Sequence, residues 1–200
     1  KRYQGRFVLN QNIGKKFKAS FNVNYSHLEQ SGVNPAATAS SATSTLMYSV
    51  WGYRPFGNNL ISEPFDENVS SANDYRFNPV INQQNIVRQN NTNNLAANAF
   101  VTYAITKDLT LKVSGGINTF INQAVAFNDT LTSYGNSKLT GNGVNGSVIY
   151  SNVNSWLNEN TLTYDKRFNS DHLLNVVAGI TEQEVNTSSY GSAANLLPTQ

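Results

Sequence analysis

The sequence predicts an all-β fold, an antiparallel meander of about six strands in three hairpins that forms part of the wall of a large transmembrane β-barrel. Apolar and polar residues alternate with period two in three pairs of segments, which is typical of half-buried strands. Short turns within the pairs alternate with long connections between them, as in barrels that have long extracellular loops. Charged residues make up only 13% of the chain, about half of the usual share in soluble domains.

The composition excludes several classes of protein. Neutral polar residues dominate, with 31 Asn, 20 Ser and 16 Thr in 200 residues. The net charge of +2 gives no sign of a nucleic-acid partner or a polybasic surface. The absence of cysteine excludes a disulfide scaffold and a thiol nucleophile. No apolar run reaches the length of a membrane-spanning helix. We expect no cofactor and no enzymatic activity.

The first hairpin is predicted at about 3–28. Its second arm has one apolar face, opposite a face that bears lysine, serine and asparagine; the apolar face holds Phe17, Ala19, Phe21, Val23 and Tyr25. Gly14 and two lysines make the turn, since turns favour glycine and polar residues.

The second and third hairpins are predicted at about 94–121 and 153–184. Gly115 and Gly116 interrupt the second hairpin and predict a bend or a bulge. In the third hairpin Glu182 and Glu184 share the apolar face. We expect these two carboxylates at the loop end of their strand, where water reaches them.

Long loops are predicted at 29–93, 122–152 and 185–200, with a short helical turn at 43–50 in the first. Compact soluble domains rarely contain structureless loops of this length, whereas outer-membrane barrels do. The segment 172–182 would be roughly 33 Å long at about 3.3 Å per residue, enough to cross the apolar band when tilted. Aromatic residues near strand ends predict an interfacial girdle: Tyr3, Phe17, Tyr25, Phe120, Tyr164 and Phe168. Six strands cannot close a barrel, so we expect a segment of a longer one.

Several runs of residues resemble the SusC/RagA family, TonB-dependent outer-membrane transporters of Bacteroidetes. The resemblance rests on three hairpin segments in the expected order, 3–25, 98–116 and 159–179, and on the loop segment 45–55. It implies that residues 1–200 are a segment of the barrel domain, without the plug domain and TonB box. It also implies active import of nutrients, glycans or peptides, across the bacterial outer membrane. The implied partners are a SusD-like surface lipoprotein, TonB through the plug, outer-membrane lipid, and an oligosaccharide or peptide substrate.

Candidate contact residues lie in the first long loop. Aromatic side chains near an arginine can stack on sugar rings or anchor a protein lid, but they can equally pack the loop onto the barrel rim. The set consists of Tyr48, Trp51, Tyr53, Arg54 and Phe56. Carboxylates at Asp66, Glu67 and Asp74 leave open a surface calcium site, although they lack the EF-hand spacing. We predict no catalytic residue.

Two alternatives to the importer remain open. One is a barrel that is not energised, like a porin, and the other is a secreted β-sandwich, such as an adhesin or a carbohydrate-binding module. A sandwich would bury the apolar faces of two sheets against each other, whereas a barrel wall would leave them to lipid.

Overall fold

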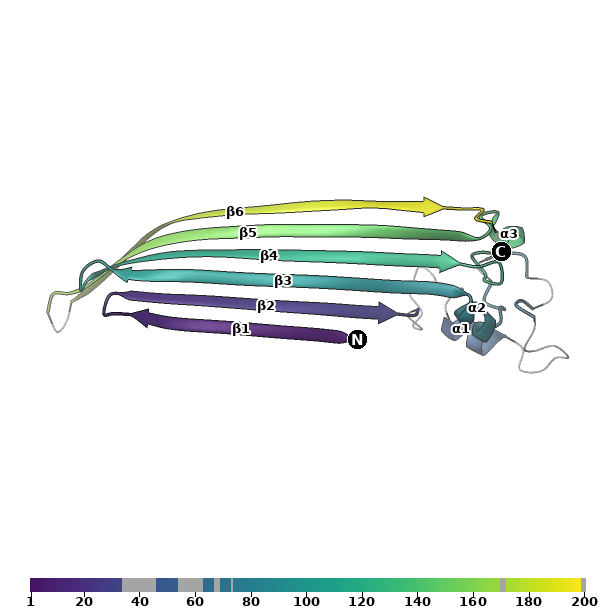
Figure 1. Cartoon of the computed structure of the whole chain (residues 1–200), viewed down its shortest axis with the longest axis horizontal. Coiled ribbons are helices and arrows are strands. Elements are labelled where there is room, and N and C mark those ends of the chain that lie inside the picture. Colours follow the sequence, from purple (N-terminus) through teal and green to yellow (C-terminus); the bar gives the residue numbers. More distant parts are fainter. Residues whose placement is uncertain (34–45, 54–62, 67–68, 73, 170–171, 199–200) are drawn as a thin grey trace. The chain divides into compact units, whose positions relative to one another are not determined.

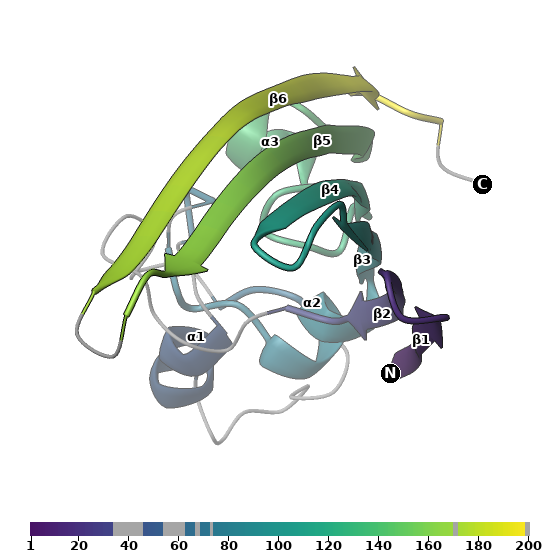
Figure 2. The same cartoon turned by 90° about the vertical axis from the view of Figure 1, so that its left-hand side faces the viewer.

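The computed structural model describes residues 1–33, 46–53, 63–66, 69–72, 74–169 and 172–198. Its strands form one six-stranded sheet in which chain neighbours are sheet neighbours, so the predicted meander is confirmed (Figures 1 and 2). The strands are β1 (Arg2–Ile13), β2 (Phe17–Ser31), β3 (Ile86–Ala104), β4 (Leu109–Asn128), β5 (Asn145–Arg167) and β6 (Leu173–Ala194). The helices are α1 (Leu46–Gly52), α2 (Pro79–Gln84) and α3 (Ser137–Thr140).

The chain divides into two compact units, each of which contains part of the sheet. The first unit comprises Lys1–Leu28, Thr92–Asn122 and Ser151–Ser189, and includes the short turns between β1 and β2, β3 and β4, and β5 and β6. The second unit comprises Glu29–Asn91, Gln123–Tyr150 and Tyr190–Gln200. All three helices and the long connections belong to this second unit.

Cross-strand contacts in the first unit show which residues share a face. In the β1–β2 register Phe7 lies opposite Val23. The Phe17 ring stacks on Tyr103 of β3, with 4.4 Å between centroids and 20° between planes. These aromatic and aliphatic pairs all fall on the face that the sequence predicts to be apolar, and such pairs stabilise neighbouring strands.

The opposite face of the first unit is held by amides and hydroxyls. Arg6 Nε donates to Asn22 Oδ1 over 3.3 Å, and Thr92 Oγ1 donates to Asn122 Oδ1 over 2.9 Å. Because successive side chains of a strand point to opposite faces, these bonds keep the polar set together across neighbouring strands.

No second layer covers the apolar face of the first unit among the described residues. The side chains of Phe7 and Ile180 are 57% and 71% exposed, and every residue of β1 and β6 is exposed. The buried apolar residues, Ala72, Phe77, Ile81 and Val144, all belong to the second unit. A β-sandwich needs two packed sheets, so the single sheet argues against that alternative.

Four strands are longer than predicted, and the loop boundaries are corrected accordingly. The predicted loop 29–93 loses its last part to β3, which begins at Ile86, and the loop 122–152 shrinks to 129–144. The predicted third loop, 185–200, is mostly strand, because β6 continues to Ala194. In these extensions polar residues occupy both faces. The strands and their backbone hydrogen bonds therefore continue beyond the alternation of apolar and polar residues by which a half-buried strand is recognised.

Three local predictions are wrong: the bulge at Gly116, the place of Phe120 in the girdle and the place of Glu184 at a strand end. Between the Thr92–Asn122 contact and the Ile105–Leu109 contact, β3 and β4 have the same number of residues. Neither strand therefore contains an extra residue, and Gly116 does not form a bulge. A Cβ at Gly116 would instead lie 2.3 Å from Asn98 Oδ1, so the glycine makes room for that amide. Phe120 has the parity of Asn122 and therefore lies on the polar face, outside the predicted girdle.

Glu184 lies inside β6 and not at its end. Its Oε2 accepts a hydrogen bond from Trp156 Nε1 over 3.1 Å, and its Oε1 accepts one from Asn186 Nδ2 over 2.8 Å. The apolar face of β6 therefore changes to a polar one at Glu182, while the strand itself continues.

Candidate binding site

The predicted loop aromatics lie in and after α1. Tyr48 and Trp51 are three residues apart, which places them on one side of a helix, and their ring centroids are 5.7 Å apart in an edge-on arrangement. Tyr75 joins them, 6.4 Å from Tyr48. A Cβ at Gly52 would lie 2.1 Å from the Tyr75 ring, so only glycine lets this ring approach the helix.

Only part of the predicted set comes together. Trp51 is 70% exposed, so its ring remains available for a contact. The Tyr53 hydroxyl donates to the Glu63 carbonyl over 3.0 Å, which gives Tyr53 a role in holding the loop. Arg54 and Phe56 lie outside the described residues. Tyr75 was missed because it lies far from the other aromatics in sequence, and no local pattern links them.

The segment around Asp74 is closed by an ion pair. Arg76 Nη2 lies 2.6 Å from Asp74 Oδ2, and Arg76 Nε lies 3.0 Å from Asp74 Oδ1. The hydrogen bond from Arg76 holds the pKa of Asp74 below its usual range. Both oxygens of Asp74 are therefore already engaged by a cation. Within the described part of the chain no three His, Cys, Asp or Glu side chains form a metal-binding group.

Asn78 anchors the start of α2. Its Oδ1 accepts hydrogen bonds from Val80 N and Ile81 N over 3.0 and 3.2 Å, the arrangement of an N-cap. The Asn78 backbone N–H donates to the Pro64 carbonyl over 2.8 Å. Pro64 is thus fastened to the start of α2 through the backbone of Asn78.

The two long connections are tied to each other. Asn82 Oδ1 on α2 accepts a hydrogen bond from Ser133 N over 3.1 Å, and Asp129 N donates to the Asn85 carbonyl over 3.1 Å. Asn82 and Ser133 are both buried, and buried polar groups with partners fix a loop in one arrangement.

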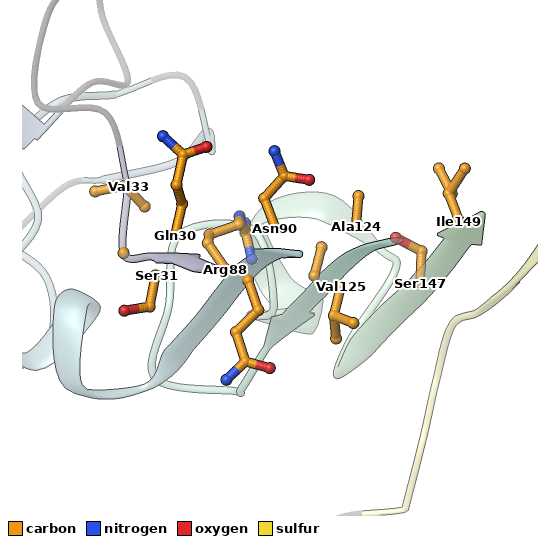
Figure 3. A pocket seen from close by; sticks show the side chains of 12 residues that line it. Gln30, Ser31, Val33, Arg88, Asn90, Ala124, Val125, Ser147 and Ile149 are labelled. Atoms are coloured by element: carbon orange, nitrogen blue, oxygen red, sulfur yellow. The ribbon is translucent and has the colours of Figure 1, made fainter. Parts of the chain in front are cut away.

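A cavity of about 630 Å³ lies in the second unit, beside the last residues of β2 and β4 and the first residues of β3 and β5 (Figure 3). Gln30 and Asn90 stand on the same side of the sheet as Ala124 and Ile149, whereas Val125 points to the other side. Arg88 also lines the cavity. The sequence does not point to this cavity, because its lining comes from four separate stretches, and all four lie within the predicted loops 29–93 and 122–152.

Arg88 is held by three hydrogen bonds. Its Nη1 donates to the carbonyl oxygens of Val87 and Phe127 over 2.8 and 2.9 Å, and its Nη2 donates to Asn128 Oδ1 over 2.7 Å. Asn128 in turn donates to Asn145 Oδ1 over 2.7 Å. This network fixes the guanidinium against the sheet, on the polar face.

None of the described helices is long and apolar enough to span a bilayer.

The sequence matches no family model and no curated protein. Solved structures of the RagAB peptide transporter have the same fold. One matches with a TM-score of 0.75 at 15% identity, and the peptide importer in its open-open state matches with 0.70 at 16%. The closed-closed state matches with 0.65 at 15% identity. Each match covers 96% of this chain and 21% of the other. The chain therefore has the fold of part of a RagAB transporter chain and spans about a fifth of its length.

Proposed function

We propose that this chain is a wall segment of a TonB-dependent importer in the bacterial outer membrane, which takes up peptides or glycans with a SusD-like surface lipoprotein. One observation supports this most strongly. A sheet with the fold of a RagAB transporter segment has an exposed apolar face opposite a face of amides and hydroxyls. Contiguous exposed apolar surface of this kind marks a contact with lipid or protein.

The two faces suit two different solvents. Side chains such as Val176 and Ile180, 49% and 71% exposed, would be removed from water by hydrocarbon, at about 25 cal/mol per Å² of apolar surface. On the other face Asn22 and Thr92 form hydrogen bonds across the strands and can also bind water in a lumen. The wall thus separates lipid from an aqueous path.

Further strands complete the wall in this proposal. In hydrocarbon each unpaired backbone N–H or C=O costs several kcal/mol, so a sheet that spans a membrane must close. The outer edges of β1 and β6 have no neighbouring strand among the described residues. We expect strands of the longer protein to pair with both edges.

The loop aromatics form the contact surface for the lipoprotein in this account. Trp51 is more exposed than Tyr48 and Tyr75; the Tyr48 ring packs against Trp51, and the Tyr75 ring packs against Tyr48. An exposed tryptophan with aromatic support is a common centre of a protein interface. The chain itself performs no catalysis in this proposal. It seals the path, lines it and provides part of the entrance.

Uptake by the full-length protein tests the function. Cells that express it would be given a mixture of labelled peptides and glycan oligomers, with and without a protonophore, and in a strain that lacks TonB. We expect uptake that is lost in both conditions. Uptake that continues without energy would overturn the importer in favour of the porin alternative, because a porin needs only a concentration gradient. Deletion of the neighbouring lipoprotein gene should reduce uptake at low substrate concentration.

A further inference from the structure

The cavity beside β2 to β5 has a floor of small side chains. Ala124, Ala126 and Ser147 lie where β4 and β5 pass beneath it, while Asn122 and Asn128 on the same strand face fill their positions with amides. The small residues leave space that Gln30, Asn90 and Ile149 border. The volume of about 630 Å³ falls in the range of small-molecule and short-peptide sites.

A positive charge at this cavity is not neutralised by the described residues. The hydrogen bonds of Arg88 all go to neutral oxygens, those of Val87, Phe127 and Asn128. No carboxylate pairs with Arg88 in the part of the chain that the structure describes. A guanidinium has five N–H groups, and these bonds use three, so two donors remain for a ligand. A partly buried arginine with free donors favours a carboxylate, which it can bind with two parallel bonds.

The neighbouring amides also have capacity for a ligand. Asn90 Oδ1 is shielded from solvent and has no hydrogen-bond partner within the described residues. A buried amide oxygen without a partner is unfavourable, so an N–H from a ligand would gain a bond here without breaking a protein contact. Gln30 adds a second amide on the same side of the sheet (Figure 3). Two amides that offer donors and acceptors match the N–H and C=O of a peptide bond.

We propose that this cavity binds an acidic peptide, with Arg88 on a side-chain carboxylate and the amides of Gln30 and Asn90 on the peptide backbone. This inference rests on the proposed function as an importer and adds a substrate class to it. Ile149 and Val33, which also line the cavity, provide apolar contact for the aliphatic part of the ligand. The amide pair favours a peptide over an acidic sugar, because a sugar offers hydroxyls in place of a backbone amide.

Binding to the full-length protein in detergent tests the inference by calorimetry. The probes are two short peptides blocked at both ends, one with a central glutamate and one with glutamine in its place. We expect the acidic peptide to bind about tenfold or more tightly, since a hydrogen bond to a charged group contributes about 1.5–3 kcal/mol. Arg88→Gln should abolish this preference, so that the two peptides bind about equally.

A matched pair of variants guards against misfolding of the Arg88 variant. Asn90→Asp places a carboxylate beside Arg88 and should weaken binding of the acidic peptide by about tenfold or more. Asn91→Asp makes the same change in charge one residue away, on the opposite face of β3, and should leave the affinity within about twofold. An equal loss in both variants would overturn the site, because a general charge effect would then explain it.

The remaining outcomes separate this inference from the proposed function. Equal binding of both peptides, with energised uptake intact, would overturn the acidic site and leave the importer standing. Tight binding of a galacturonic acid oligomer, without binding of the acidic peptide, would overturn the peptide in favour of an acidic sugar. Loss of energised uptake for all substrates in the wild type would overturn the function and this inference together.

Discussion

Two adjacent residues of β6, Asn175 and Val176, allow the sharpest test of which face of the sheet meets lipid. Val176 lies on the apolar face, and Arg at that position should prevent assembly, because an arginine facing lipid at the bilayer centre costs about 2–4 kcal/mol. Asn175 points to the other face and donates to Asp165 Oδ1. Asn175→Arg places a cation beside that carboxylate and should assemble normally.

The readout for these two variants is the fraction of full-length protein that migrates as a folded species on an unheated gel of outer membranes. The two variants carry the same added charge at neighbouring positions, so each is a control for the other. Equal assembly of Val176→Arg and Asn175→Arg would contradict the assignment of faces.

At position 135 the neighbouring backbone of Asp129 lies too close to leave room for any side chain, so the residue must be glycine. A Cβ there would lie 2.0 Å from the Asp129 carbonyl oxygen, whereas a Cβ at Gly5 would meet nothing within 4 Å. Gly135→Ala should destabilise the 129–144 connection by about 1–3 kcal/mol, as over-packing does, and Gly5→Ala should be neutral. Limited proteolysis of the folded protein would show faster cleavage in 129–144 for the first variant only. Equal cleavage in both variants would show that the connection accommodates the methyl group.

At the scale of elements, the Asp74–Arg76 pair predicts a loop that loosens in acid. The hydrogen bond from Arg76 lowers the pKa of Asp74 in the folded loop. The pair therefore stabilises the loop above the unfolded pKa of about 4, and this stabilisation is lost as the pH falls through the folded pKa. The Asn78 N–H donates to the Pro64 carbonyl in this loop, and its hydrogen exchange, corrected for the intrinsic rate, should rise below about pH 4.

Asp74→Asn provides the control for that measurement. Its side-chain amide cannot titrate, so exchange at the Asn78 N–H should be insensitive to pH over the same range. The same acid response in the variant would show that another group controls the opening of the loop.

The strands could be predicted from the sequence where one face meets an apolar environment. The Phe17–Tyr25 alternation predicts β2 correctly, because the residues on one face are apolar and those on the other face are polar. The first part of β3, from Ile86 to Asn93, is predicted as loop, since asparagine is depleted in strands and both faces are polar. This part of β3 is held as a strand by pairing with the neighbouring strands, and that tertiary effect leaves no local pattern in the sequence.

The candidate sites were predictable to a smaller extent, for the same reason. Tyr48 and Trp51 are close in sequence and were found together, but Tyr75 joins them only through the fold. Arg88 could not be recognised as a cavity residue, because its partners at Phe127 and Asn128 are about 40 residues away along the chain. Sites built across strands depend on register, and the sequence indicated register only where the apolar faces alternate.

For the whole molecule, the central claim is that one face of the sheet meets lipid and the other meets water. The strands exceed the roughly 9–11 residues that a tilted strand needs to span a bilayer, with 23 residues in β5 and 22 in β6. We therefore expect only the parts with an apolar face, such as 172–182, which includes the start of β6, to lie in hydrocarbon. The polar parts beyond Glu182 would stand in water.

Cysteine labelling in intact outer membranes tests this claim most directly. The 200 residues contain no cysteine, so single cysteines at Leu174, Asn175, Val176 and Val177 can be introduced into a cysteine-free full-length protein and treated with a membrane-impermeant maleimide. We expect labelling at 175 and 177 and protection at 174 and 176, and labelling of single cysteines placed at both Asn186 and Thr187. Uniform labelling from 174 to 177 would contradict a wall between lipid and water.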